Sequence, residues 1–167
     1  MSIDAVQAVL DYLKEHELLL TTAESCTAGR MVALLSEIPG SGEVLESGYV
    51  VYSPTAKQRL LRVSADTIEQ FGLTSVQVAR EMAVGALQDS PANVAVATTG
   101  VAGPEPQGDI KPGTLCFAWA FAGEPIAVFT RTLHFDGDRE AVMHKSSLHG
   151  LEQVRNFHQR WLRGERA

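Results

Sequence analysis

One run of small and hydroxyl residues could carry nucleophilic chemistry: Thr21-Thr22-Ala23-Glu24-Ser25-Cys26-Thr27-Ala28-Gly29. Apolar, strand-like residues precede it, and the apolar spacing of residues 31–35 that follow is typical of a helix. The pattern predicts a strand-to-helix turn with hydroxyl residues at the helix N-terminus, where backbone N–H groups are free. A serine there could be a nucleophile whose oxyanion is held by neighbouring N–H groups. The alternative is that Ser25 or Glu24 only caps the helix, because these residue types are common in a first turn.

Three more segments place polar side chains where strands are predicted to end, at residues 49–57, 98–104 and 136–139. Ligands usually bind at the strand ends of an open α/β sheet, so these segments could share one site with the run around Ser25. Each segment also has a simpler explanation. The simpler roles are a solvated charge for Lys57, a core position for Tyr52, a tight turn for Gly100 and Gly103, and pairing with a first-turn carboxylate for Arg139.

Lys57 is the base that the sequence offers to Ser25. The five histidines suggest neither a Ser/His/Asp arrangement nor a metal-binding pair. A Ser–Lys dyad needs a neutral lysine, which burial or a neighbouring cation can provide. We therefore expect Ser25 Oγ and Lys57 Nζ to lie within direct or one-water reach, at about 2.6–3.2 Å per link.

Helices and strands alternate along the chain, which predicts an α/β fold with helices on both faces of the sheet. The expected strands are residues 17–22, 44–52, 93–98, 114–121 and 126–135. The last two are joined at Gly123-Glu124-Pro125 as a hairpin, so the sheet should be mixed. The first expected helix ends near residue 16, and the second lies between the Ser25 run and Pro39. Three more helices are expected to begin at Ser53-Pro54, at Ser64 and at a capping box over residues 74–77. The last expected helix covers residues 138–163.

Size and composition indicate one globular domain over residues 1–167. The formal net charge is −6 and no block of Lys or Arg appears, which argues against a nucleic-acid partner. No apolar run approaches the roughly 20 residues of a membrane span. The two cysteines, Cys26 and Cys116, lack metal-ligand spacing, so we expect no metal, no disulfide and a cytoplasmic location.

Five motifs together resemble one family, and their order and spacing carry the resemblance. They are residues 23–27, residues 48–57, Thr99-Gly100-Val101-Ala102-Gly103-Pro104, Lys111-Pro112-Gly113-Thr114 and residues 137–142. Over about residues 5–163 the chain resembles the C-terminal domain family of the competence/damage-inducible protein CinA, whose members include stand-alone nicotinamide-nucleotide amidohydrolases. The resemblance implies a three-layer α/β/α sandwich. It also implies hydrolysis of nicotinamide mononucleotide to nicotinate mononucleotide and ammonia, without a cofactor.

Roles for individual residues follow from the same resemblance. Ser25 matches the nucleophile and Lys57 the base, with Tyr52 beside it. Arg139 matches a basic residue suited to a phosphate. The remaining substrate-binding positions are Glu24, Cys26, Thr27, Thr99, Gly100 and Gly103.

The chain departs from the family at two places, with Ala28-Gly29 where two glycines are usual and Met143-His144 where basic residues are usual. A substrate-altered or non-hydrolytic homologue that binds a nucleotide or a partner protein is therefore the alternative function. Self-association is plausible for the family.

Overall fold

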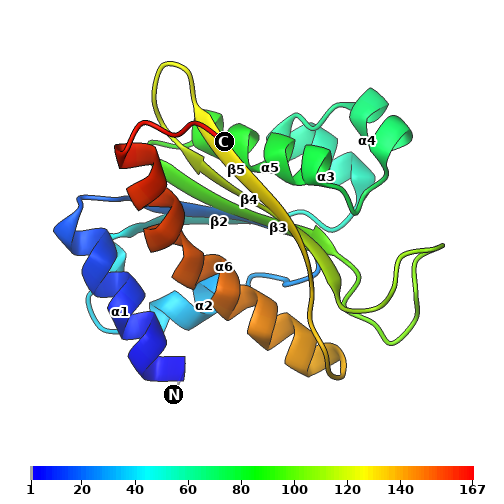
Figure 1. The fold of residues 1–167 in the computed structure, drawn as a ribbon, viewed down its shortest axis with the longest axis horizontal. Coiled ribbons are helices and arrows are strands. Elements are labelled where there is room, and N and C mark those ends of the chain that lie inside the picture. Colours follow the sequence, from blue (N-terminus) through cyan, green and yellow to red (C-terminus); the bar gives the residue numbers. More distant parts are fainter. Residues whose placement is uncertain (1) are drawn as a thin grey trace.

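Five strands form one mixed sheet in the computed structural model, which describes residues 2–167 (Figure 1). The strands are β1 (Leu20–Glu24), β2 (Leu45–Val50), β3 (Val94–Gly100), β4 (Thr114–Phe121) and β5 (Ala127–His134), and their order is β2-β1-β3-β4-β5. β1 pairs in parallel with β2 and β3, whereas β4 is antiparallel to β3 and β5. The predicted mixed sheet, with its hairpin of the last two strands, is confirmed.

Helices cover both faces of the sheet, as Figure 1 shows. One face carries α1 (Ser2–Glu15), α2 (Arg30–Ser36) and α6 (Arg139–Leu162), and the other carries α3 (Pro54–Leu61), α4 (Ala65–Phe71) and α5 (Val76–Asp89). A short 3-10 helix, η1 (Ser41–Glu43), precedes β2. The three-layer α/β/α sandwich is therefore confirmed. No helix within residues 2–167 has the length and apolar character that a bilayer crossing needs.

The two faces of the sheet are packed with side chains of different size. Along β4, the large residues Phe117, Trp119 and Phe121 face α1, α2 and α6. The small residues Ala118 and Ala120 alternate with them and face α5. The small side chains allow α5 to lie close to the sheet, and α5 in turn supports α3, which carries Lys57.

The contact between α3 and α5 depends on a glycine. A Cβ added at Gly85 of α5 would lie 2.0 Å from the carbonyl oxygen of Leu61, a backbone atom that cannot move aside. We expect Gly85→Ala to lower the free energy of unfolding by about 1–3 kcal/mol, measured by urea denaturation. Gly150→Ala is the matched helical control, because the nearest atom there is the flexible Met31 Sδ at 2.9 Å. An equal loss in both variants would contradict this explanation.

Three helix starts agree with the predicted caps, and two boundaries do not. The side chains of Ser53, Ser64 and Asp138 each accept a backbone hydrogen bond at the start of α3, α4 and α6. The capping box over residues 74–77 is displaced, since Ser75 caps α5 by accepting from the Val78 N–H. The helix after the Ser25 run begins only at Arg30, so Ser25 does not lie in a helix N-terminal turn.

Candidate active site

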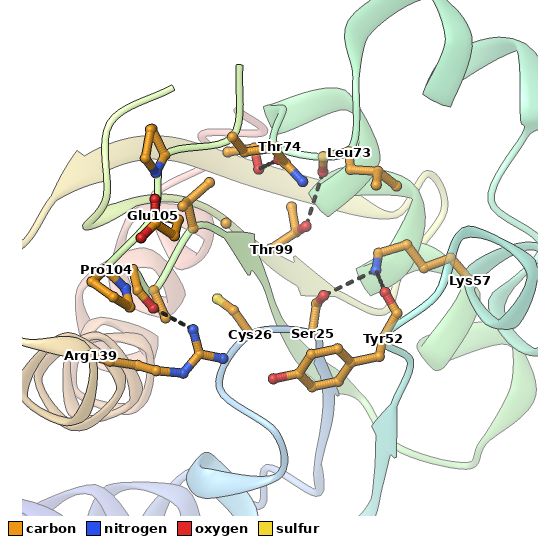
Figure 2. Close-up of a pocket in the computed structure, with 16 residues that line it drawn as sticks. Ser25, Cys26, Tyr52, Lys57, Leu73, Thr74, Thr99, Pro104, Glu105 and Arg139 are labelled. Atoms are coloured by element: carbon orange, nitrogen blue, oxygen red, sulfur yellow. Dashed lines mark hydrogen bonds between the residues drawn. The ribbon is translucent and has the colours of Figure 1, made fainter. Parts of the chain in front are cut away.

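The carboxyl ends of the parallel strands meet at one edge of the sheet, and a cavity of about 480 Å³ opens there (Figure 2). Segments far apart in the sequence line it: residues 25–26, 52 and 57, 73–74, 99–107 and 139. Parts of all four polar strand-end segments, as expected, therefore line one cavity.

Ser25 and Lys57 lie in direct hydrogen-bond contact in this cavity. Lys57 is only 1% exposed, and its Nζ lies 3.0 Å from Ser25 Oγ, which confirms the predicted distance. Burial lowers the pKa of Lys57 to about 8, because the protein interior disfavours the charged ammonium. The simpler role of a solvated surface charge is therefore wrong for this lysine.

Two backbone carbonyls orient the Lys57 amine. Nζ donates to the carbonyl oxygens of Val51 at 2.8 Å and Tyr52 at 2.9 Å. Carbonyl oxygens only accept, so a neutral amine uses both of its N–H bonds on them. The remaining tetrahedral position holds the lone pair and faces Ser25 Oγ. The arrangement can thus present a base to the serine hydroxyl.

Glu24 and Ser25 are adjacent but point to opposite sides, because side chains alternate along a strand. Glu24 is fully buried and accepts from the hydroxyls of Thr22 at 2.9 Å and Thr27 at 2.7 Å. It also accepts from two backbone N–H groups in the first turn of α2. Neither Glu24 nor the Thr27 side chain lines the cavity, so the substrate contacts predicted for them are not supported. Glu24 instead caps α2, as the simpler explanation predicted.

Removing the Glu24 carboxylate would leave four buried donors without their acceptor. We expect Glu24→Ala to lower the free energy of unfolding by about 3–5 kcal/mol, since each unsatisfied buried donor carries a desolvation cost. Urea denaturation of the variant measures the loss. Glu37→Ala, at the exposed other end of α2, is the control and should change stability by less than about 0.5 kcal/mol. A comparable small change in Glu24→Ala would show that the carboxylate is dispensable.

Tyr52 and Thr99 lie on opposite walls of the cavity. The Tyr52 side chain is at the mouth beside Ser25, with the residue 53% exposed, so the simpler core position is wrong (Figure 2). Thr99 is buried, and its hydroxyl donates to the Leu73 carbonyl at 2.9 Å. This bond joins the end of β3 to the connection between α4 and α5.

The loop after β3 is shaped by two glycines and closed by Arg139. A Cβ at Gly100 would lie 2.5 Å from the Thr114 carbonyl oxygen, so the absence of a side chain lets β3 and β4 approach. Gly103 has φ +96°, which favours glycine. Its carbonyl accepts from the guanidinium of Arg139, which extends into the cavity toward Cys26 (Figure 2). The simpler role of Arg139, pairing with a first-turn carboxylate, is not found among residues 2–167.

Cys26 lines the cavity next to Ser25. The thiol is buried, and burial raises its pKa to about 12 because the interior disfavours a thiolate. A neutral thiol at neutral pH is a weak nucleophile. Within this adjacent pair, it is Ser25 whose Oγ has a base in hydrogen-bond contact, at 3.0 Å from Lys57 Nζ.

The profile of the CinA C-terminal domain matches residues 3–158. The chain belongs to this family. The CinA-like protein of Chlorobium luteolum is 41% identical over 166 residues, which cover 96% of this chain and 37% of that protein. The nicotinamide-nucleotide amidohydrolase PncC of Escherichia coli is 42% identical over 144 residues, or 85% of this chain and 86% of that protein. The chain thus spans little more than a third of the CinA-like relative and most of PncC.

Solved structures of the CinA superfamily have the same fold. The competence damage-inducible protein A from Klebsiella pneumoniae superposes with a TM-score of 0.90 at 32% identity, covering 96% of this chain and 98% of that one. The competence-damaged protein superfamily member from Escherichia coli superposes with a TM-score of 0.88 at 33% identity, covering 94% and 90%. The fold expected from the sequence motifs is thereby supported independently.

Part of the cavity wall in this CinA C-terminal domain comes from residues that the sequence did not indicate as site residues. These residues come from the α4–α5 connection and from the loop after β3: Leu73, Thr74, Glu105, Pro106 and Gln107. The Thr74 hydroxyl donates to Gln107 Oε1 at 3.1 Å and links the two segments. The loop from Glu105 is exposed, and its contact with residue 74 arises only from tertiary folding.

The departures from the usual CinA pattern lie outside this cavity. Ala28, Met143 and His144 line a second hollow of about 540 Å³ between α2 and α6. Ala28 has φ 55°, a left-handed conformation that explains why glycine is usual there. Its methyl group does not line the cavity that holds Ser25.

Proposed function

We propose that this chain hydrolyses the carboxamide of nicotinamide mononucleotide, giving nicotinate mononucleotide and ammonia. The observation that carries the proposal is the hydrogen bond between Ser25 and the buried Lys57 in an open cavity. A volume of about 480 Å³ falls in the range of small-molecule sites. The names of the PncC relatives, which specify a nicotinamide nucleotide, support the substrate class.

The chemistry is acyl transfer. Ser25 Oγ attacks the carboxamide carbon while Lys57 Nζ takes the hydroxyl proton. Backbone N–H groups of Cys26 and Thr27 hold the oxyanion of the tetrahedral intermediate. Lys57 returns the proton to the nitrogen as the C–N bond breaks, and ammonia leaves an ester on Ser25. Water then attacks this ester with Lys57 as base, which releases the carboxylate and restores the serine.

Arg139 is the group proposed to bind the substrate phosphate. One guanidinium N–H is held by the Gly103 carbonyl, and a guanidinium has further donors that suit phosphate oxygens. We expect Arg139→Ala to weaken binding of nicotinamide mononucleotide by about 1.5–3 kcal/mol, measured by calorimetry. Binding of nicotinamide riboside, which has no phosphate, should hardly change. Lys111→Ala is the control, since this exposed cation does not line the cavity. Equal losses for both ligands would contradict the phosphate assignment.

Ammonia release from a panel of amides tests the proposed function directly. The panel contains nicotinamide mononucleotide, nicotinamide riboside, free nicotinamide and glutamine. We expect the highest kcat/KM for the mononucleotide. Binding of the mononucleotide without any ammonia release would favour the alternative, a non-hydrolytic nucleotide-binding module. Release from glutamine alone would keep the amidohydrolase and replace the substrate.

A further inference from the structure

We propose that a buried chain of hydrogen bonds through Thr98, Thr27 and Glu24 positions the turn that carries the nucleophile and the oxyanion-binding N–H groups. This inference rests on the proposed function and extends it to three residues behind the cavity. All three are at most 1% exposed. Their side chains do not line the cavity, so they are positioning residues.

The direction of the chain follows from the donor count. The Thr27 hydroxyl donates to Glu24 Oε1 at 2.7 Å, because a carboxylate only accepts. A hydroxyl has one proton, so Thr27 must accept in its other contact, at 2.9 Å from Thr98 Oγ1. Thr98 therefore donates to Thr27, and Thr27 donates to Glu24. This fixed order of donors and acceptors holds the Thr27 side chain in one rotamer.

The backbone of the same turn is fixed by the same strand. Thr98 accepts from the Ser25 N–H through its carbonyl at 3.1 Å, while its hydroxyl contacts Thr27. Within the turn, the Ala28 N–H donates to the Ser25 carbonyl at 3.0 Å. The backbone carbonyl of Thr98 thus holds Ser25, and the side chain of Thr98 holds Thr27.

The backbone N–H groups of Cys26 and Thr27 lie between two N–H groups that do donate, those of Ser25 and Ala28. Within residues 2–167, no other residue accepts from either of them, and the Cys26 N–H is shared only with its own thiol. They lie between two anchored points, Ser25 at the end of β1 and the Thr27 side chain. A turn anchored in this way costs no reorganisation when the oxyanion forms, which is the condition for strong electrostatic stabilisation.

Matched substitutions separate the hydroxyl from the shape of the side chain. Thr27→Val and Thr98→Val keep the branched shape and remove the hydrogen bonds, whereas Thr27→Ser and Thr98→Ser keep the hydroxyl. We expect each valine variant to lower kcat for ammonia release by about 10- to 100-fold, since small misplacements of reacting groups have effects of this size. KM should change by less than about threefold, and the serine variants should retain kcat within about fivefold of the original protein.

Acylation of Ser25 by p-nitrophenyl acetate gives a readout that needs no pyridine nucleotide. Ser25 Oγ forms the new ester bond, p-nitrophenolate leaves, and Lys57 accepts the serine proton. Absorbance follows the leaving group, and peptide mapping by mass spectrometry confirms the modified residue. The valine variants should be acylated about 10-fold or more slowly than their serine counterparts. Circular dichroism and thermal unfolding give the folded fraction of each variant, and all rates are normalised to that fraction.

The outcomes distinguish the two proposals. A parent protein that releases no ammonia but is acylated at Ser25 would refute the substrate assignment, and the valine-to-serine comparison would still decide the positioning role. Folded valine variants that match the parent in both assays would overturn the positioning role, as would serine variants that lose as much as valine. If Thr27→Val does not fold, Thr98→Val carries the comparison, because it leaves the bond between Thr27 and Glu24 intact. A parent protein that is inactive in both assays would refute both proposals.

Discussion

Ser25→Ala should abolish ammonia release from nicotinamide mononucleotide while leaving the affinity for this nucleotide within about twofold. The hydroxyl acts by forming a bond in the transition state, so its loss appears in kcat and not in binding. We expect kcat to fall by at least about 10³-fold, the scale on which loss of a nucleophile acts. A coupled ammonia assay and calorimetry measure the two quantities separately.

Ser36→Ala is the matched control for this variant. Its hydroxyl lies on the exposed side of α2 and donates only to the Ala33 carbonyl in its own helix. Ammonia release should therefore stay at the level of the parent protein. Undiminished ammonia release by Ser25→Ala would exclude the serine as nucleophile.

Lys57→Met should lower kcat/KM by about 10²- to 10⁴-fold, the usual contribution of a positioned general base. The unsubstituted protein should also show a pH dependence that the variant lacks. Because a neutral amine is needed and the pKa of Lys57 is about 8, kcat/KM should rise about tenfold per pH unit below pH 8 and level off above it. Lys145→Met, an exposed lysine of α6, is the control and should keep the profile.

The same lysine predicts how stability changes with pH. Its pKa is lowered on folding, from the ordinary 10.5 to about 8, so between these values the unfolded chain binds more protons than the folded protein. Stability should therefore rise with pH across this window, relative to Lys57→Met, by about 3 kcal/mol in total. Urea denaturation of both proteins at pH 7 and pH 10.5 measures the difference. A constant difference between the two proteins would show that the amine is not desolvated in the folded state.

Local sequence signals predicted much of this fold because they act over a few residues. Ser53-Pro54 predicted the start of α3, and the strand expected over residues 93–98 corresponds to β3. Since parallel strands end at the same edge, the meeting of Ser25 and Lys57 was also predictable. Their separation of 32 positions in the sequence did not matter for that expectation.

The sequence left two roles open for Glu24, a substrate contact and a helix cap, although a rule that decides between them was available. Alternation along β1 places Glu24 and Ser25 on opposite faces, so both side chains could not serve one cavity. The hydroxyl-rich motif obscured this, because every polar residue in it resembled a substrate contact. The wall formed by Thr74 and Gln107 had no such rule, since their contact depends on how the α4–α5 connection meets the loop after β3.

The two carbonyls that hold the Lys57 amine determine which substitutions near this lysine leave its position unchanged. Both oxygens belong to the main chain, at Val51 and Tyr52, and lie within six residues of the lysine. Every amino acid supplies the same carbonyl, so a substitution of Tyr52, which lines the cavity, alters the cavity surface without removing the groups that aim the base. Specificity could therefore diverge at position 52 while the chemistry at Lys57 is inherited unchanged.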